Sequence, residues 1–351
     1  MVAMSGGVDS SVSACLLQRQ GYEVVGVTLQ LWPGGGSKAG GCCGWSAVND
    51  ARRVAGRLGI PHYVLNFRSI FEEQVVDYFC REYLRGRTPN PCISCNRHIK
   101  FGALLEQAES LGMDYLATGH YARIQSDPGS GRLQLRRGVD RKKDQSYVLY
   151  HLTQRQLARL KFPLGELTKE QVRAIAREAG LAVAGKPESQ EICFIPDNDH
   201  GCFVAARHPQ EARPGPIIDV DGRVLGQHRG LQHYTIGQRR GLGIAAPRPL
   251  YVVGLDAGHN AVIVGDQSLV WRDRCTAADL NFIAVERLER EMAVMAKIRY
   301  SAEPAAAVIS PCGEDLVEVR FQRPVRAITP GQAVVFYQDD LVIGGGVIDK
   351  S

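Results

Sequence analysis

The string Ser5-Gly6-Gly7-Val8-Asp9-Ser10-Ser11 constrains the fold of this chain more than any other stretch. It follows a short apolar start and enters a helical pattern in which Val8, Val12 and Leu16 share one face before Gly21. An extended apolar run then covers residues 24–29. Strand, glycine turn, helix and strand in this order open a parallel α/β sheet. We therefore expect an α/β fold organised around this loop.

The loop also has the chemistry of an anion site. Two glycines let the backbone approach an anion closely, and the first N–H groups of the following helix have no partner within it. The hydroxyls of Ser5, Ser10 and Ser11 add donors, which predicts a phosphate cradle at the helix start. A Walker loop is excluded, because the Gly-Lys-Ser/Thr ending is absent. The plainer alternative is an ordinary turn in which Asp9 stabilises the helix start.

Length and composition indicate a globular protein of several domains. The chain has 351 residues, of which 44% are hydrophobic and 23% charged, enough for two or three domains. No apolar run reaches the length of a membrane span and no signal peptide precedes the first strand, so we expect a cytoplasmic protein and no membrane contact. Met1 lies so close to the loop that a truncated or misassigned start is one explanation for the short first strand.

Periodicity and turn signals predict the order of elements. We expect a helix capped by Asn49, a buried strand at residues 62–67 and an exposed, extended loop at residues 87–96. Further helices are predicted at residues 70–84, 101–111 and 168–180, the last with a Thr168–Gln171 capping box. A strand is expected at residues 115–118 and a hairpin arm at residues 133–135.

The composition changes in the second half of the chain. Residues 201–265 are rich in Gly, Pro and short β runs, such as 251–253 and 262–264. Short alternating strands at 317–321, 333–337 and 341–343 predict a small β-barrel. The expected division is a catalytic α/β domain (1–198), a small, mainly β central domain (199–270) and a C-terminal β-barrel (271–351).

Ten cysteines in a reducing compartment favour catalysis, metal binding or inert thiols over disulfides. Cys92-x-x-Cys95 is half of a zinc knuckle, a redox pair or a coincidence, and the lack of a second such pair disfavours structural zinc. Cys193 is notable, because it follows the polar run 188–191 rather than an apolar core pattern. The other cysteines are expected in helix cores (Cys15, Cys80), in a glycine-rich surface loop (Cys42, Cys43) or without a role (Cys202, Cys275, Cys312).

The glycine loop resembles the pyrophosphate-binding motif of the N-type ATP pyrophosphatases, which include GMP synthetase, NAD synthetase and the tRNA thiolases. Further strings narrow the resemblance to the bacterial tRNA-specific 2-thiouridylases (MnmA family) over essentially the whole chain. Those strings are Thr88-Pro89-Asn90-Pro91 with Cys95-Asn96, Thr118-Gly119-His120-Tyr121-Ala122, Lys143-Asp144-Gln145-Ser146-Tyr147 and Glu188-Ser189-Gln190-Glu191-Ile192-Cys193-Phe194.

The resemblance implies ATP-dependent insertion of sulfur at C2 of the wobble uridine in the tRNAs for Lys, Glu and Gln. It implies an ATP site at Ala3, Met4, Ser5, Gly6, Gly7, Val8, Asp9, Ser10, Leu29 and Gly119. It implies tRNA contacts at Asn90, Pro91, Cys92, His120, Lys143, Asp144, Gln145, Arg299, Tyr300 and Gln332. We also expect phosphate contacts from Arg136, Arg137, Lys142 and Lys143 and from the barrel.

Cys193 would carry a persulfide that a cysteine desulfurase or a sulfur-relay protein delivers, and Cys95 would be the second catalytic cysteine. Adenylation of the uridine oxygen would create an AMP leaving group, with the glycine loop and Mg²⁺ stabilising the pyrophosphate. The chain departs from the commoner pattern at Cys92, where many relatives carry Asp. Cys92, Cys95 and Cys193 together could hold a [4Fe-4S] cluster with one open iron, or Cys92 could be a spare thiol.

Two other functions remain open at this point. A nucleotide synthetase or ligase of the same superfamily would explain the loop but leave Cys95 and Cys193 unused. A non-enzymatic RNA-binding protein would use the barrel and the basic segments but not the loop.

Overall fold

The computed structural model describes residues 1–32, 45–187, 192–195 and 199–350. The chain divides into two compact units whose segments alternate along the sequence. Unit 1 comprises residues 1–75, 92–196 and 340–342, and unit 2 comprises residues 76–91, 197–339 and 343–351.

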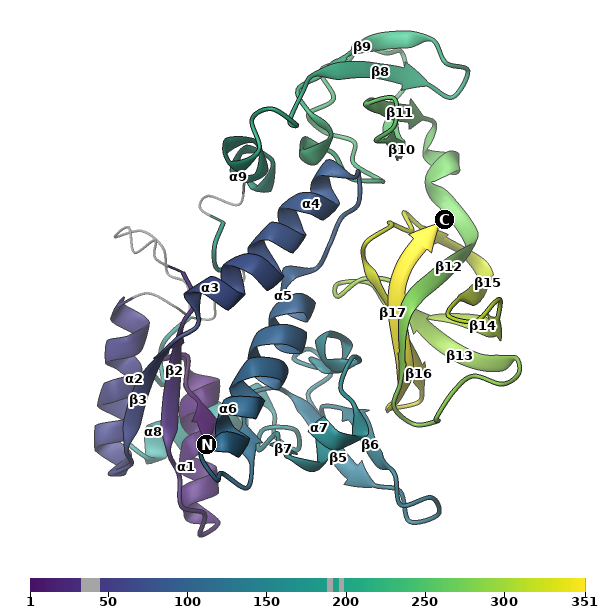
Figure 1. Cartoon of the computed structure of the whole chain (residues 1–351). Helices are drawn as coiled ribbons and strands as arrows, with labels where there is room; N and C mark the ends of the chain where they lie inside the picture. The colour runs from purple at the N-terminus through teal and green to yellow at the C-terminus, as the bar shows by residue number, and fades with distance from the viewer. Residues whose placement is uncertain (33–44, 188–191, 196–198, 351) are drawn as a thin grey trace. The chain divides into compact units, whose positions relative to one another are not determined.

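Unit 1 is built on a parallel sheet whose strand order is β3-β2-β1-β4-β7 (Figure 1). The strands are β1 (Val2–Ala3), β2 (Gly26–Gln30), β3 (His62–Asn66), β4 (Leu116–Ala117) and β7 (Leu160–Lys161). The α/β fold predicted from the glycine loop is therefore confirmed. The strand at residue 62 is not buried as expected: it lies at the sheet edge, and the side chain of Tyr63 is 59% exposed.

One hydrophobic core joins the central strand to helices α1 (Val8–Arg19), α2 (Trp45–Leu58) and α8 (Lys169–Glu178). Val12 of α1, Val54 of α2 and Val172 of α8 are buried in it. Helix α1 ends at Arg19 and Gly21 adopts a positive φ of 85°, as the sequence predicts. The capping box on α8 is also present. The predicted Asn49 cap is wrong, because α2 begins at Trp45 and buries Ala47 and Val48 in its first turns.

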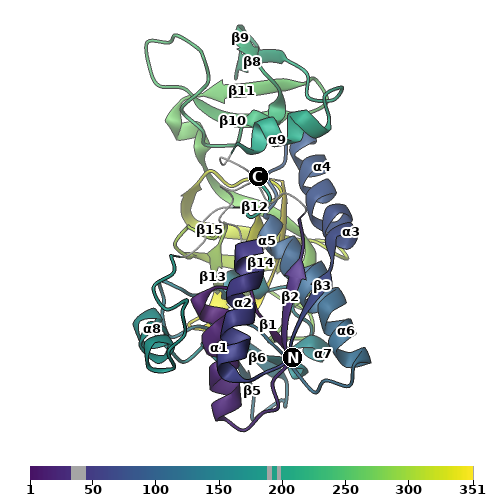
Figure 2. The same cartoon turned by 90° about the vertical axis from the view of Figure 1, so that its left-hand side faces the viewer.

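Two long helical runs follow, visible side-on in Figure 2. The first comprises α3 (Arg68–Phe71), the π-helical segment η1 (Glu72–Asp77) and α4 (Tyr78–Leu84), which matches the predicted helix. The second comprises α5 (Pro91–Ser94), the π-helical segment η2 (Cys95–Ala103) and α6 (Leu104–Ser110). The predicted extended loop is therefore wrong from Pro91 onward. Proline is tolerated in the first turn of a helix, where its missing N–H costs nothing.

Short elements complete unit 1. Strands β5 (Ala122–Ser126) and β6 (Leu133–Arg137) form the predicted hairpin. They are followed by the 3₁₀ turn η3 (Ser146–Leu149) and helix α7 (Gln154–Ala158). Leu341, at the start of β17, pairs with Arg136 of β6.

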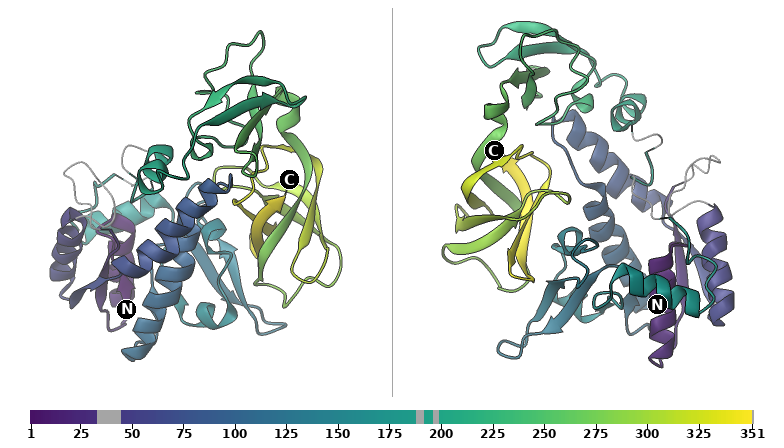
Figure 3. Two further views of the ribbon diagram at one scale, coloured as in Figure 1. Left: turned by 45° about the horizontal axis from the view of Figure 1, so that its top comes forward. Right: turned by 180° about the vertical axis from the view of Figure 1, so that it is seen from behind.

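Unit 2 contains the predicted small central domain and β-barrel, shown from two sides in Figure 3. Helix α9 (His200–Arg207) precedes a sheet with the order β10-β11-β8-β9. Its strands are β8 (Gly215–Asp219), β9 (Val224–His228), β10 (Tyr251–Asp256) and β11 (Ala261–Gly265), with the 3₁₀ turns η5 (Leu231–His233) and η6 (Gln267–Val270). The barrel strands are β12 (Trp271–Phe282), β13 (Met292–Lys297), β14 (Ala305–Pro311), β15 (Val317–Arg326), β16 (Ala333–Gln338) and β17 (Leu341–Lys350).

The barrel closes because β12 pairs with both β15 and β17. A turn at residues 329–332 lies between β15 and β16, where Gln332 N donates to Thr329 O at 3.2 Å. In the part of the chain that the structure describes, no helix combines the length and apolar character that crossing a membrane requires.

Candidate functional site

The glycine loop connects β1 to α1 and is shaped by close backbone packing. Gly6 has a φ of +69°, and a Cβ at this position would lie 2.2 Å from the Ala47 carbonyl oxygen. Gly7 is the N-cap of α1, and no side chain caps the helix there. The first N–H groups of α1 thus face the loop without a side-chain acceptor, the arrangement that binds phosphate at helix starts.

The serines of the loop hold its shape. Ser10 Oγ accepts from Ser5 N at 3.1 Å and lies 3.2 Å from Gly7 O, while Ser11 Oγ donates to Gly7 O at 2.8 Å. Ser11 is fully buried, so its predicted role as a phosphate donor is wrong. Ser5 is exposed at the loop surface. The buried hydroxyls therefore fix the backbone, and the exposed one is available to a ligand.

Asp9 is anchored by a lysine that the sequence did not single out. Lys169 Nζ donates to both Asp9 carboxylate oxygens at 2.8 Å, and Tyr121 Oη donates to Oδ1 at 2.7 Å. The Lys169 and Asp9 side chains are 10% and 29% exposed. Lys169 is the first residue of α8, so the Thr168 capping box was a usable signal for its position. This ion pair ties the start of α8 to the first turn of α1.

A second lysine reaches the same loop from the segment before Cys193. Lys186 Nζ donates to Gly6 O at 3.0 Å and to Asp50 Oδ2 of α2 at 2.7 Å. Its side chain remains 35% exposed. Lys186 thus provides a positive charge beside the phosphate loop, although the sequence analysis assigned it no role.

The end of β4 closes the site from the other side of β1. A Cβ on Gly119 would lie 2.8 Å from Ser10 N and 2.9 Å from Asp9 C, so only glycine allows this approach. The chain leaves β1 toward β2 on one side and returns as β4 on the other. Such a switch point is where open α/β sheets bind ligands.

The residues predicted to bind ATP all lie around this edge. They occupy the end of β1, the loop, the first turn of α1, the later part of β2 and the residue pair after β4: Ala3, Met4, Ser5, Gly6, Gly7, Val8, Asp9, Ser10, Leu29 and Gly119. Their contact with ATP stays a prediction.

His120 and Asp144, both predicted to contact tRNA, are buried. Burial, with smaller contributions from the charges of Lys100 and His151, holds the pKa of His120 well below its usual range, and Thr118 Oγ1 lies 2.7 Å from its Nδ1. Asp144 accepts from Arg137 Nε at 2.8 Å. These contacts give both residues a clear structural role, and their tRNA contacts stay predictions, as does that of Gln145, whose Oε1 accepts from Tyr121 N at 3.0 Å.

Cys92 and Cys95 lie on a helix, three residues apart and therefore on one face. Cys92 is exposed and Cys95 is half-buried. The neighbours of Cys95 are anchored: Ser94 Oγ donates to Gln74 O at 2.7 Å, and Asn96 Nδ2 donates to Val148 O at 3.1 Å. Cys95 also begins a π-helical segment, a distortion that often occurs at functional sites.

Cys193 lies in a short turn that is held by its neighbours. Phe194 is buried, with its ring centroid 5.7 Å from that of Phe71 and 6.1 Å from that of Trp32. Cys193 itself is half-buried. The preceding run 188–191 and the cysteines at positions 42 and 43 lie outside the described residues.

The proposed cluster ligands are not gathered into one group. Within the described ranges, three His, Cys, Asp or Glu ligand atoms lie within 4.8 Å of one another at Asp199, Cys202 and His233. No such group contains Cys92, Cys95 or Cys193 there. The iron–sulfur cluster therefore stays a prediction.

Of the other predicted tRNA contacts, Lys143 belongs to unit 1, whereas Asn90, Pro91, Arg299, Tyr300 and Gln332 belong to unit 2. Gln332 Nε2 donates to Thr88 O at 2.7 Å, next to Asn90 and Pro91 in the chain. Arg299 donates to the carbonyl oxygen of Arg326 at 3.1 Å, and Tyr300 is 44% exposed. Tyr300 is thus accessible to a partner, whereas Gln332 and Arg299 brace the chain around them.

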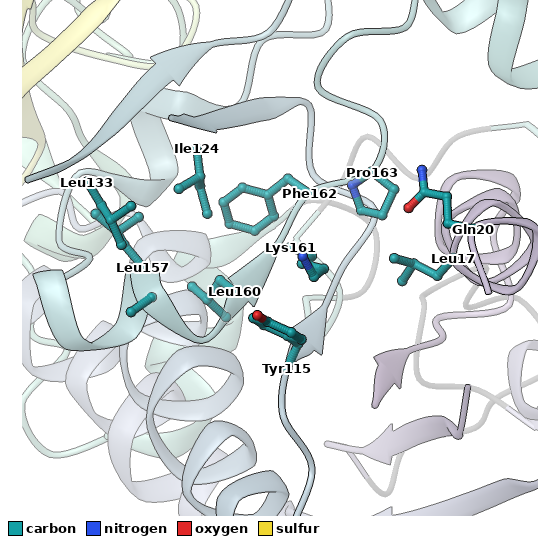
Figure 4. Close-up of a pocket in the computed structure, with 11 residues that line it drawn as sticks. Leu17, Gln20, Tyr115, Ile124, Leu133, Leu157, Leu160, Lys161, Phe162 and Pro163 are labelled. Atoms are coloured by element: carbon teal, nitrogen blue, oxygen red, sulfur yellow. The ribbon is translucent and has the colours of Figure 1, made fainter. Parts of the chain in front are cut away.

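A pocket of about 350 Å³ lies elsewhere in unit 1 (Figure 4). It is lined by Leu17 of α1 and by Gln20, the C-cap of that helix, together with Phe162, Tyr115 and Lys161. Lys161 Nζ lies 4.1 Å from the centroid of the Tyr115 ring. The glycine loop is at the other end of this helix, about 18 Å away for its length. This pocket is therefore separate from the glycine loop.

Comparison with known proteins matches the chain from end to end. The family model described as tRNA methyl transferase HUP domain matches residues 1–197, that of its PRC-barrel domain matches residues 202–266, and an aminomethyltransferase β-barrel model matches residues 272–348. The tRNA-specific 2-thiouridylase MnmA of Carboxydothermus hydrogenoformans is 59% identical over 100% of this chain and 97% of that protein. The protein of the same name from Acetivibrio thermocellus is 56% identical over 99% and 98%, respectively.

Among solved structures, the U34-tRNA thiolase NcsA from Methanococcus maripaludis is 17% identical, with a TM-score of 0.35. The match covers 60% of this chain and 66% of that one.

Proposed function

Because this chain belongs to the tRNA-specific 2-thiouridylase family, we propose that it replaces the oxygen at C2 of wobble uridine 34 in tRNA with sulfur. The observation that carries the proposal is that unit 1 contains two features together. It combines an uncapped glycine loop at the carboxyl edge of a parallel sheet with two half-buried cysteines, Cys95 and Cys193. The loop supplies a phosphate site and the cysteines supply sulfur chemistry.

The first step is adenylation of the uridine. The C2 oxygen attacks the α-phosphorus of ATP. The bond between the α-phosphorus and the oxygen that bridges it to the β-phosphorus breaks, and pyrophosphate leaves. The N–H groups at the start of α1 and the charge of Lys186 stabilise the negative charge that develops on pyrophosphate. Mg²⁺ bound to the phosphates would add positive charge there. Lys169 keeps the Asp9 carboxylate oriented and thereby the first turn of α1.

The second step transfers sulfur. The terminal sulfur of a Cys193 persulfide bonds to C2, and AMP leaves with the former C2 oxygen. The Cys95 thiolate then attacks Cys193 Sγ, which breaks the persulfide S–S bond and leaves sulfur on the base. The resulting Cys95–Cys193 disulfide is reduced by an external dithiol.

The proposed partners are those that the resemblance to this family implies. A cysteine desulfurase or a sulfur-relay protein loads the persulfide, and the substrates are the tRNAs for Lys, Glu and Gln. Reduction of the disulfide suits the cytoplasm. Cys92 and Cys95 on one helical face would suit two ligands of an iron–sulfur cluster, but Cys193 does not join them in one group of ligand atoms, so the proposed sulfur transfer uses the persulfide.

Two alternative activities would leave part of this site without a role. A synthetase of the same superfamily would need the loop but neither Cys95 nor Cys193. Methyl transfer, which the family-model descriptions name, needs neither an ATP pyrophosphate site nor a cysteine pair.

The deciding experiment incubates the purified chain with tRNA transcripts, ATP, Mg²⁺ and a desulfurase with cysteine. We expect 2-thiouridine at position 34 by nucleoside mass spectrometry, with AMP and pyrophosphate released only when tRNA is present. Release of AMP with a small acid and ammonia, without any sulfur in tRNA, would point to a synthetase instead. Anaerobic reconstitution with iron and sulfide, followed by Mössbauer spectra and the same assay, separates the cluster route from the persulfide route.

A further inference from the structure

Three side chains with different ligand chemistry converge at the start of α9, which Figure 1 labels. The carboxylate of Asp199, the thiol of Cys202 and the imidazole of His233 place ligand atoms within 4.8 Å of one another. Asp199 and Cys202 are exposed, and His233 is half-buried. All three belong to unit 2, whereas Cys95 and Cys193 belong to unit 1.

The backbone around this group is built to hold it. Asp199 is the N-cap of α9, and its Oδ1 accepts from Cys202 N at 2.9 Å. His233 comes from η5, a separate element. A Cβ on Gly201 would lie 2.0 Å from His233 Nδ1, so the absence of a side chain at position 201 lets the imidazole lie against the first turn of α9.

The donor set selects the kind of ion. One thiolate, one imidazole and one carboxylate are ligands of Zn²⁺, at distances of about 2.0–2.3 Å, whereas Mg²⁺ and Ca²⁺ prefer oxygen alone. Such bond lengths put the ligands of a tetrahedral ion about 3.5 Å apart. Atoms that already lie within 4.8 Å of one another reach this spacing by side-chain rotation.

A Cys-His-Asp nucleophile is the competing interpretation, and the contacts argue against it. A nucleophilic cysteine needs a base that removes its proton. Here the Cys202 thiol hydrogen bonds to the Asp199 carboxylate, which is a weak base at neutral pH. A metal ion, by contrast, displaces the thiol proton. The exposed Arg229 nearby opposes a cation, but thiolate and carboxylate together carry two negative charges.

We propose that Asp199, Cys202 and His233 bind one Zn²⁺, with water as the fourth ligand. The ion fastens α9 to η5 and acts as a structural clamp within unit 2. The site is independent of the thiolation reaction, and its residues are not those of the phosphate loop or the catalytic cysteines.

The test uses the full-length, tag-free, reduced protein after treatment with a chelator. Zn²⁺ is titrated in competition with a chromogenic chelator. We expect one tight equivalent in the wild type and at least a tenfold loss of affinity in Cys202→Ser, His233→Gln and Asp199→Ser. Serine at position 199 can still cap α9, so this variant separates ligand loss from helix loss. The matched control is Cys312→Ser, which removes another exposed cysteine and keeps the affinity.

X-ray absorption of the zinc-loaded wild type measures the ligand atoms of the ion directly. It does not depend on whether a variant folds. One sulfur and three nitrogen or oxygen ligands support the site, and two or more sulfurs overturn it. The proposal also fails if Cys202→Ser binds Zn²⁺ like the wild type, or if Cys193→Ser loses the equivalent that Cys202→Ser retains. Zn²⁺ should raise the melting temperature of the wild type but not that of Cys202→Ser, and equal melting shifts would contradict the clamp.

Discussion

Single residues decide the geometry of the phosphate loop, and Gly6 is the strictest case. Its positive φ costs a side-chain-bearing residue about 1–2 kcal/mol, and a Cβ would in addition overlap the carbonyl of Ala47. Gly21 also has a positive φ, but a Cβ there meets nothing within 4 Å. A side chain would therefore strain the backbone at both positions, but it would clash with a neighbouring residue only at Gly6.

The first prediction compares these glycines. Gly21→Ala should lower the free energy of unfolding by about 1 kcal/mol and leave ATP affinity unchanged. Gly6→Ala should cost about 3 kcal/mol or more and weaken ATP binding at least tenfold, because the loop must move. Urea unfolding and calorimetric ATP titration measure both quantities. Equal effects of the two variants would mean that the close approach to Ala47 has no energetic weight.

The second prediction concerns the cysteines. Cys95→Ser and Cys193→Ser should each reduce thiolation to background, since a serine hydroxyl can neither carry the persulfide at position 193 nor form the disulfide from position 95. ATP and tRNA affinity should stay near wild type, because neither residue is in the glycine loop. Cys312→Ser is the control for cysteine loss in general. Wild-type thiolation by Cys193→Ser would eliminate the persulfide assignment.

A third prediction follows from His151, whose pKa burial lowers to about 3 from the usual 6.5, with a smaller contribution from Arg97. Between these values the unfolded chain binds a proton that the folded chain does not, so stability falls as the pH falls. The slope from this residue approaches about 1.4 kcal/mol per pH unit. His120 acts in the same direction.

His151→Leu should therefore give a flatter curve of unfolding free energy against pH below about 6.5, as measured by urea unfolding. The remaining slope would come from His120 and other groups. Parallel curves for variant and wild type would show that His151 titrates alike in both states.

At the scale of elements, the start of a helix positions Lys169 beside the glycine loop. Helix α8 begins with a capping box in which Gln171 N donates to Thr168 Oγ1 at 3.3 Å, and its first residue is Lys169. Helix α7 has the same box between Thr153 and Gln156, also at 3.3 Å. Of these two capping boxes, the one on α8 is followed by a residue, Lys169, that contacts Asp9 at the glycine loop.

The fourth prediction uses this pair of caps. Thr168→Ala and Thr153→Ala should each lower the free energy of unfolding by about 1 kcal/mol. Thr168→Ala should also weaken ATP binding by up to about fivefold, because Lys169 loses its fixed position beside Asp9. Calorimetric titration with ATP separates the two variants. If both weaken ATP binding alike, the effect is general destabilisation.

On the scale of the whole molecule, the basic residues that could meet tRNA occur in both units, but not all remain available. Arg136 pairs with Asp340 at 2.7 Å and Arg137 with Asp144 at 2.8 Å, so their expected phosphate contacts compete with internal ion pairs. Arg141 and Lys142 are exposed. We therefore expect the latter two to contribute more of the phosphate contacts in their segment.

The fifth prediction is the salt dependence of tRNA binding. Affinity should fall steeply as salt rises, and replacing both Arg141 and Lys142 by Ala should reduce the slope of log K against log salt by roughly 1.5. Arg155→Ala, which removes an exposed arginine paired with Glu109, is the control and should leave the slope unchanged. A wild-type affinity that is flat across a tenfold change in salt would rule out phosphate-dominated binding.

The sequence by itself determined the features that depend on neighbouring residues. The glycine loop, the helix from Val8 and the Thr168 cap were predictable, because periodicity and capping are properties of a few adjacent residues. Local signals misled where distant contacts prevail. Two prolines suggested an extended loop, but Ser94 and Asn96 bond to Gln74 and Val148, which stabilises a helix through Cys95 instead.

Only the tertiary structure decided which distant groups meet. Lys169 reaches Asp9 because α1 and α8 share one core, and Gly119 touches Ser10 because β4 lies beside β1. The group of Asp199, Cys202 and His233 likewise depends on the packing of α9 against η5, and Cys202 alone had no motif. These pairings follow from strand order and helix packing. A pattern of adjacent residues in the sequence does not specify either of them.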